Sequence, residues 1–251
     1  MSLKFLYLHL HGLIRSNSLE LGRDSDTGGQ TQYVLELVKS LANTSEVDQV
    51  DLVTRLIKDS KIDSSYSKEQ EFIAPGARIL RFQFGPNKYL RKELFWPYLD
   101  ELTQNLIQYY QKYENKPSFI HAHYADAGYV GVRLSQALKV PFIFTGHSLG
   151  REKKRKLLEA GLKINQIEKL YCISERINAE EESLKYADIV VTSTKQESVS
   201  QYSQYHSFSS EKSKVIAPGV DHTKFHHIHS TTETSEIDNM MLPFLKDLRK
   251  P

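Results

Sequence analysis

The sequence predicts an α/β protein built on a Rossmann-like, doubly wound and mainly parallel sheet. Short apolar, β-branched runs alternate along the chain with longer stretches of helical period. Several runs are apolar at consecutive positions, as expected for strands that helices cover on both faces. Strands that alternate with helices pair in parallel through right-handed crossovers, so both observations favour the same sheet.

The elements follow in order from these two patterns. The apolar run that begins at Leu3 predicts the first strand, and the apolar spacing of residues 33–41 predicts the first helix. The predicted strands are residues 5–10, 50–53, 79–84, 119–121, 142–145, 189–192 and 214–217. The predicted helices are residues 30–42, 94–113, 127–138, 151–160, 164–185 and 195–202. Residues 58–66 are polar and predict a solvated loop.

Composition restricts the partners. With 33 basic against 31 acidic residues, the net charge is +2, so no global field attracts nucleic acid or a membrane surface, and any anion site is local. The single cysteine, Cys172, excludes an intrachain disulfide and predicts an inert, buried thiol in a cytoplasmic protein. No apolar stretch reaches membrane-spanning length, and the first residues lack the pattern of a signal peptide.

The carboxyl-terminal region predicts the domain organisation. Residues 230–235 are rich in serine and threonine, which indicates a linker, and residues 237–248 have the apolar spacing of an amphipathic helix. We therefore expect a Rossmann-like domain over residues 1–229. Residues 230–251 are expected to be a linker and helix that end at a domain boundary.

Ligands of doubly wound sheets bind beyond the carboxyl ends of the strands, so the segments after the strands are functional candidates. The pair Gly28-Gly29 lies between the first strand and the first helix. Glycines there let the backbone approach a ligand, and the helix N-terminus attracts an anion, usually a phosphate. The alternative is a plain glycine turn.

A basic cluster follows the strand at residues 142–145. After residues 146–150 come five cations, Arg151, Lys153, Lys154, Arg155 and Lys156. Cations in the first turn of a helix oppose its dipole, which favours an anion site there, with hydrogen bonds from His147 and Ser148. The alternative is a solvated basic face.

Other polar residues allow two interpretations each. His121 and His123 could ligate a metal with Asp126, but too few ligands converge, so a polar segment that touches a sugar through His123 or Tyr124 is favoured. The histidines of residues 226–229 give the same weak metal signal.

Two cations in other segments are further candidates. Lys92 follows a basic turn and could reach an anion or lie on the surface. Arg176 could form a helix-surface ion pair with Glu180, four residues later, or clamp a phosphate.

Five motifs together carry a family resemblance. Gly28-Gly29-Gln30 and residues 121–126, 145–150, 176–181 and 216–220 occur in the order and spacing of the retaining, sucrose-forming glycosyltransferases of the GT-B type. Over residues 5 to about 225, the chain resembles the amino-terminal half of bacterial sucrose-phosphate synthases, with sucrose synthases as close relatives.

The resemblance implies two Rossmann-like domains that face a cleft, with no metal and no other cofactor. This chain would bind fructose 6-phosphate, and an absent carboxyl-terminal domain would bind most of UDP-glucose. Glucose would be transferred with retention, and the departing UDP phosphate would take the proton of the acceptor. The protein would orient the substrates and stabilise the developing diphosphate charge.

The resemblance also assigns residues to roles. Gly28 and Gly29 would approach the reacting centre, and His147 would contact the transferred glucose. The acceptor would be bound by Gln30, Lys92, Tyr124, Ser148, Lys153 and Arg176. The three cations among them are expected to converge around the phosphate of the acceptor, because plain fructose would leave them unpaired.

Alternative functions remain. A sucrose synthase or a related glycosyltransferase would use a different acceptor, and a non-catalytic sugar-phosphate binding module would need no second domain. A nicotinamide-dependent dehydrogenase is disfavoured, because no Gly-x-Gly-x-x-Gly motif follows the first strand with an acid at the end of the second.

Overall fold

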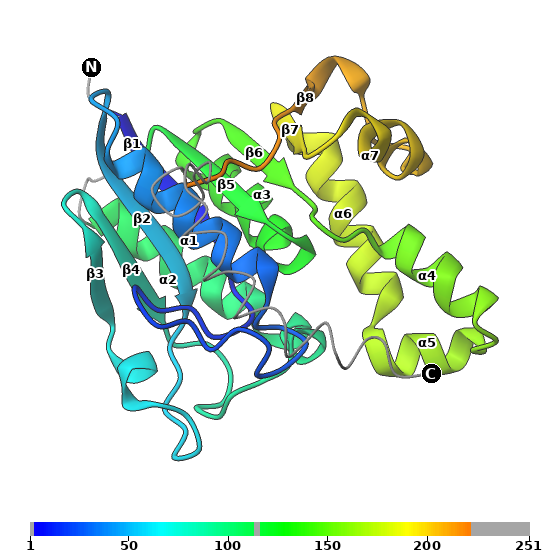
Figure 1. Ribbon diagram of the computed structural model, residues 1–251, viewed down its shortest axis with the longest axis horizontal. Helices are drawn as coiled ribbons and strands as arrows, with labels where there is room; N and C mark the ends of the chain where they lie inside the picture. The colour runs from blue at the N-terminus through cyan, green and yellow to red at the C-terminus, as the bar shows by residue number, and fades with distance from the viewer. Residues whose placement is uncertain (1–2, 113–115, 222–251) are drawn as a thin grey trace, which may run out of the picture. The chain divides into compact units, whose positions relative to one another are not determined.

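One sheet organises the computed structural model, which describes residues 3–112 and 116–221 (Figure 1). Within these ranges the sheet has eight strands in the order β3-β4-β2-β1-β5-β6-β7-β8. The strands are β1 (Leu3–Leu8), β2 (Val47–Arg55), β3 (Gln70–Ala74), β4 (Ala77–Phe82), β5 (Phe119–His123), β6 (Phe142–Thr145), β7 (Ile189–Thr192) and β8 (Ser213–Val215). All neighbours pair in parallel except β3 and β4, which confirms the predicted α/β fold.

Helices cover the sheet on both faces. They are α1 (Gly29–Ala42), α2 (Leu99–Lys112), α3 (Ala125–Leu138), α4 (Gly150–Glu159), α5 (Ile164–Tyr171), α6 (Ile173–Tyr186) and α7 (Lys195–Ser200). Successive side chains of a strand point to opposite faces, so Leu6 and Leu8 of β1 join one apolar core and Tyr7 joins the other. The first core is shared with α2 and α3 and the second with α1, which is why the sheet is wound on both sides (Figure 1).

The edge of the sheet beyond β4 differs from the prediction. The strand β3, which the sequence did not predict, pairs antiparallel with β4, and its Phe72 is 73% exposed. The predicted solvated loop at residues 58–66 contains a short 3-10 turn, Ser64–Ser67. Its Tyr66 is buried with Leu13 and Ile57, so the prediction of a fully solvated loop was wrong.

The predicted helix at residues 164–185 is two helices. Cys172 has a left-handed backbone (φ 44°), which ends α5 and begins α6 in a new direction. Its thiol is only half-buried and donates to the carbonyl of Glu93 at 3.4 Å, and burial raises its pKa. The sequence predicted a buried thiol, whereas the structure shows one that is partly exposed.

Within the described residues, the chain up to Ala217 forms one compact unit. The predicted linker and helix at residues 230–251 and the histidines of residues 226–229 lie outside the described residues. None of the helices in the described ranges combines the length and the apolar character needed to span a bilayer.

Candidate functional site

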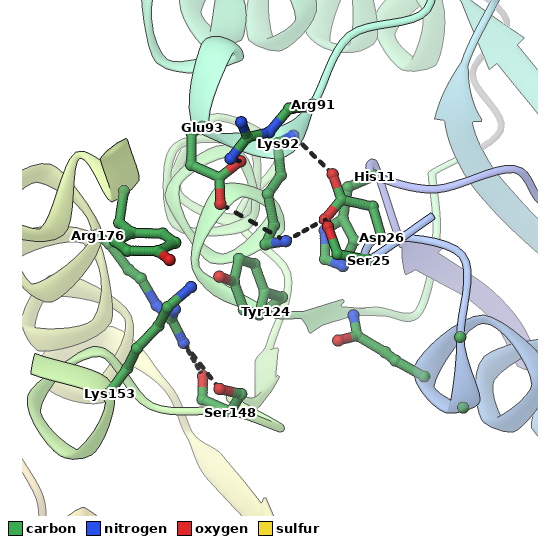
Figure 2. Close-up of a pocket in the computed structure, with 14 residues that line it drawn as sticks. His11, Ser25, Asp26, Arg91, Lys92, Glu93, Tyr124, Ser148, Lys153 and Arg176 are labelled. Atoms are coloured by element: carbon green, nitrogen blue, oxygen red, sulfur yellow. Dashed lines mark hydrogen bonds and ion pairs between the residues drawn. The ribbon is translucent and has the colours of Figure 1, made fainter. Parts of the chain in front are cut away.

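The carboxyl ends of β1, β5 and β6 open into a cavity of about 470 Å³ (Figure 2). Eight of the nine residues proposed from the sequence line it: Gly28, Gly29, Gln30, Lys92, Tyr124, Ser148, Lys153 and Arg176. They come from segments that lie far apart in the chain. The expected convergence of three cations at one rim of the sheet is therefore present.

Residues 24–29, which we call the glycine loop, end at the N-terminus of α1. The carboxylate of Asp24 accepts from the backbone N–H groups of Asp26 and Thr27, both at 2.8 Å, which fixes the turn before the glycines. A Cβ at Gly28 or Gly29 would meet no atom within 4 Å, and the backbone of Gly28 is extended. These glycines are therefore not needed for the turn, and they leave open space above a helix N-terminus.

Tyr124 joins β5 directly to α3. The sequence predicted a loop over residues 121–126, but β5 continues through His123 and α3 begins at Ala125. Tyr124 has φ 81° and His147, after β6, has φ 57°. Side chains larger than glycine rarely adopt such angles, and strained residues of this kind concentrate at functional sites.

Arg176 belongs to a buried network rather than to the helix surface. It is 3% exposed, and its Nε donates to Glu180, which is fully buried, at 3.0 Å. Its Nη2 donates to the carbonyl and the hydroxyl oxygen of Ser148, and its guanidinium lies 4.6 Å from the ring centroid of Tyr124. Glu180 also accepts from the backbone N–H of Gly150. The predicted ion pair exists, but a surface location for it was wrong.

Lys153 is the cation of the basic cluster that faces the cavity. Its Nζ lies 3.8 Å from the ring centroid of Tyr171, and among residues 3–112 and 116–221 no carboxylate lies within 4.0 Å of it. Burial, followed by the charges of Arg176 and Lys92, lowers the pKa of Lys153 to about 8. Three other cations of the cluster pair with glutamates of α4 or α6: Arg151, Arg155 and Lys156.

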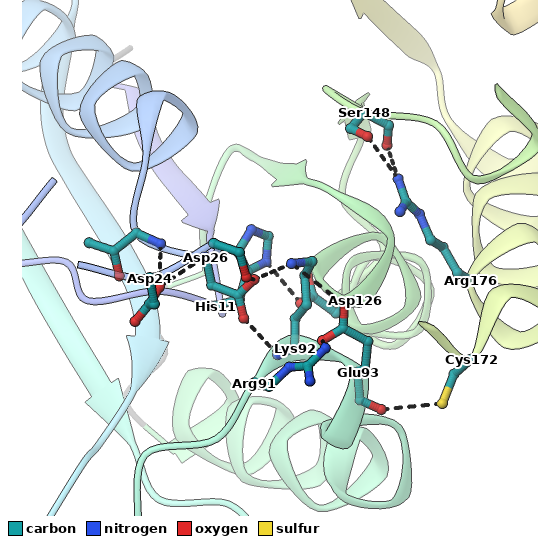
Figure 3. Close-up of polar contacts among 12 residues, drawn as sticks. His11, Asp24, Asp26, Arg91, Lys92, Glu93, Asp126, Ser148, Cys172 and Arg176 are labelled. Carbon is teal, nitrogen blue, oxygen red and sulfur yellow. Dashed lines mark hydrogen bonds and ion pairs between the residues drawn. The ribbon is translucent and has the colours of Figure 1, made fainter. Parts of the chain in front are cut away.

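Lys92 is already paired inside the cavity. Its Nζ contacts a carboxylate oxygen of Asp26 and lies 3.7 Å from Glu93, and its backbone N–H donates to Asp26 at 3.0 Å (Figure 3). Burial alone would raise the pKa of Asp26, but the hydrogen bonds and charge of Lys92 outweigh it and lower that pKa. Asp26 and Glu93 thus compensate the charge of Lys92 from within the cavity lining.

His147 lies beside the cavity and is not among its lining residues. Its Nε2 lies 2.8 Å from Nδ1 of His123, and burial lowers the pKa of His147 to about 3. Nε2 of His121 lies 2.8 Å from the hydroxyl oxygen of Thr145. Within the described residues, no three His, Cys, Asp or Glu side chains are grouped so that they could hold a metal ion.

Sequence reasoning missed several lining residues: His11, Ser25, Asp26, Arg91, Glu93 and Tyr171. His11 and Asp26 lie between the first strand and the first helix, a position that signals a functional segment but not which side chains face inward. The cavity lining has two parts that differ in charge. The positive corner comprises Ser148, Lys153 and Arg176, and the loop side comprises His11, Asp26 and Lys92.

Known proteins resemble this chain over most of its length. A model of the first GT-B domain of sucrose synthase matches residues 2–235. Probable sucrose-phosphate synthase 2 of Arabidopsis thaliana is 42% identical over 232 residues, and the sucrose-phosphate synthase of Spinacia oleracea is 41% identical over 229. These alignments cover 82% and 80% of this chain but 22% of each relative, so the chain spans less than a quarter of their length.

Solved structures share the fold. A sucrose-phosphate synthase from Thermosynechococcus elongatus superposes with a TM-score of 0.71 and 24% identity, over 93% of this chain and 52% of that one. The Anabaena protein HepE, solved in complex with UDP-glucose, superposes with a TM-score of 0.53 and 13% identity, over 95% of this chain and 49% of that one. Both neighbours are about twice as long as the matched region.

Proposed function

Since the chain belongs to the family of the first GT-B domain of sucrose synthase, we propose that it is the acceptor-binding half of a retaining glucosyltransferase. The proposed reaction transfers glucose from UDP-glucose to fructose 6-phosphate and gives sucrose 6-phosphate and UDP. The names of the plant relatives and the UDP-glucose bound to one structural neighbour support this choice. We further propose that residues 230–251 lead to a donor-binding domain, and that the protein is cytoplasmic.

The observation that carries the proposal is the positive corner. The guanidinium of Arg176 and the ammonium of Lys153 lie on one wall of the cavity, and the countercharge of Arg176 is supplied from behind by Glu180. A sugar phosphate could therefore receive charge-assisted hydrogen bonds there without a rival carboxylate. Ser148 adds a hydroxyl at the same place. Tyr124 and Gln30 line the space where the sugar ring would lie.

The glycine loop is proposed to meet the donor. The open space over Gly28 and Gly29, at the N-terminus of α1, suits a diphosphate. In the transfer, the bond between the anomeric carbon and the UDP oxygen breaks, and a bond to the hydroxyl oxygen of fructose forms on the same face. The hydroxyl proton passes to the departing phosphate. His147 is proposed to contact the glucose with its Nδ1 edge, because its Nε2 is bound to His123.

Calorimetric titration of the chain with fructose 6-phosphate, fructose and UDP-glucose tests the proposal. Fructose 6-phosphate is expected to bind at least about tenfold more tightly than fructose, since one charge-assisted contact stabilises a complex by about 1.5–3 kcal/mol. UDP-glucose is expected to bind weakly, because most of its site would lie in the second domain. Equal affinity for fructose and fructose 6-phosphate would refute the assignment.

One observation favours a second candidate, sucrose synthase. Lys92 already has two carboxylate neighbours, so an unphosphorylated acceptor would leave fewer cations unpaired than the sequence suggested. Product formation from UDP-glucose with fructose, compared with fructose 6-phosphate, separates the two in the protein that contains both domains. This chain alone is expected to be inactive, and transferase activity from residues 1–251 would contradict the two-domain proposal.

A further inference from the structure

A buried hydrogen bond joins His11 of the loop side to Asp126, which lies behind it, and the proposed reaction gives neither residue a part. Nδ1 of His11 lies 3.0 Å from a carboxylate oxygen of Asp126, and the two residues are 4% and 1% exposed (Figure 3). His11 lies in the segment that follows β1, and Asp126 lies in the first turn of α3. Only His11 lines the cavity.

The surroundings of Asp126 determine how it holds the ring. Its other carboxylate oxygen accepts the backbone N–H of Ala127 at 2.6 Å, at the N-terminus of α3, where the helix dipole favours negative charge. An ionised carboxylate only accepts hydrogen bonds, so Nδ1 of His11 is the donor. In the neutral imidazole, Nε2 is then left as an acceptor.

The position of His11 is fixed on three sides. Gly12 has φ 76°, and a Cβ there would lie 2.3 Å from the carbonyl oxygen of Asp26, so the turn after His11 is pressed against the glycine loop. The backbone N–H of Leu13 donates to the hydroxyl of Thr27 at 3.0 Å. The ring of Tyr124 meets the ring of His11 edge to face, with centroids 4.7 Å apart.

Nε2 of His11 offers a hydrogen-bond acceptor in a cavity whose other charged groups are mostly donors or already paired. Among the described residues, the two carboxylates that line the cavity, Asp26 and Glu93, are both paired with Lys92. Most of the other charged groups there are donors. A sugar hydroxyl that must present its oxygen to an electrophile needs a partner that accepts its hydrogen. His11 is a base of the lining with no cation in contact among residues 3–112 and 116–221.

We propose that Nε2 of His11, held in one tautomer by Asp126, accepts a hydrogen bond from a hydroxyl of the acceptor sugar and so directs a lone pair of that oxygen toward the glycine loop. His11 is then a substrate-binding residue and Asp126 a positioning residue that acts through it. No bond is made or broken at the ring. This inference rests on the proposed function, because it requires the acceptor sugar to occupy this cavity.

Asp126→Asn tests the inference with almost no change of shape. The backbone N–H of Ala127 should still donate to the amide oxygen of the new side chain. The NH₂ group of that side chain then faces Nδ1 of His11. The ring must then carry its hydrogen on Nε2 and become a donor toward the cavity. Nitrogen-15 NMR of the histidine side chains reads the tautomer directly, in the 251-residue chain. Fructose 6-phosphate is expected to bind about tenfold more weakly, whereas inorganic phosphate, which needs only the cations, binds as before.

A second pair of variants keeps the test decisive if Asp126→Asn fails to fold. The amide of His11→Gln can still offer an oxygen to the sugar and is expected to retain most of the affinity that His11→Phe loses. Where Asp126→Asn does fold, adding it to His11→Gln should cost little further affinity, because the two residues act through one contact.

Three outcomes overturn the inference. One is an unchanged tautomer in Asp126→Asn, and another is a switched tautomer with unchanged affinity for fructose 6-phosphate. The third is equal affinity in His11→Gln and His11→Phe. If the parent chain binds inorganic phosphate but not fructose 6-phosphate, the proposed function itself fails, which is a distinguishable result.

Discussion

The positive corner and the loop side of the cavity hold their cations in opposite ways. In the positive corner, the carboxylate of Glu180 lies behind Arg176 and outside the cavity lining. On the loop side, the carboxylates of Asp26 and Glu93 that neutralise Lys92 are themselves part of the lining. An anion can therefore enter the positive corner without breaking an ion pair, whereas Lys92 must exchange partners before it can bind one.

The number of cations around a cavity is therefore a poor measure of its affinity for anions. What matters is where each countercharge lies. A buried carboxylate behind an arginine fixes its direction and compensates its charge, while a carboxylate inside the cavity competes with the ligand.

The largest effect is expected from removal of the countercharge of the positive corner. Glu180→Ala leaves the guanidinium of Arg176 buried and uncompensated, so the free energy of unfolding should fall by about 3–5 kcal/mol. Urea denaturation measures this loss. The matched control is Glu159→Ala, which removes an exposed i,i+4 pair with Arg155 and should cost far less, because solvent screens that pair. Equal losses in the two variants would show that Glu180 contributes no more than a surface pair.

The next largest effect is on binding. Lys153→Ala removes a cavity-facing cation that has no carboxylate in contact within the described residues, so fructose 6-phosphate should bind more weakly by about 1.5–3 kcal/mol. Calorimetry measures the affinity, and Lys156→Ala, an exposed cation on the same helix, is the control. Arg176→Ala should lose a similar amount but also leaves Glu180 unpaired. Unchanged affinity in Lys153→Ala would remove the positive corner from the proposed site.

The layers of the fold could be predicted from the sequence because each rests on local periodicity. The strands at residues 5–10 and 142–145 and the helix at residues 30–42 follow from apolar spacing alone. The edge strand β3 was missed because only its pairing with β4 specifies it, and Phe72 remains exposed there. The break at Cys172 was missed because a left-handed residue other than glycine leaves no mark on the apolar pattern.

The sequence predicted the cations and glycines of the candidate site. It did not predict which carboxylate pairs with which cation or histidine. Lys92 and Asp26 are 66 residues apart, and His11 and Asp126 are 115 apart, so no spacing rule relates them. Arg176 and Glu180 are related by helical spacing, but the sequence did not show that α6 buries them. Long-range charge compensation depends on tertiary packing, and this is the part of the site that residue patterns cannot supply.

The pH dependence of binding should distinguish the contribution of Lys153 from that of Arg176 beside it. Because burial lowers the pKa of Lys153 to about 8, its ammonium is charged at pH 7 and largely neutral well above pH 8. A bound phosphate favours the charged form, so affinity for fructose 6-phosphate should be highest near pH 7 and fall as the pH rises through 8. Calorimetry should detect a loss of up to about tenfold between pH 7 and pH 9. In Lys153→Arg the charge persists, and a profile as steep as that of the parent would show that another group titrates.

The smallest predicted effect has the opposite sign and bears directly on the contrast between the two sides. Asp26→Asn removes one of the two carboxylate partners of Lys92, while the amide oxygen can still accept the backbone N–H of Lys92. Inorganic phosphate should therefore bind more tightly, by about 1 kcal/mol, because one ion pair no longer competes with the ligand. Calorimetry in Asp26→Asn and in the Lys92→Gln/Asp26→Asn double variant measures the gain, which should vanish when Lys92 is absent. If Asp26→Asn weakens phosphate binding instead, the Lys92–Asp26 pair serves to shape the site rather than to compete with the anion, and the two sides are more alike than their charges suggest.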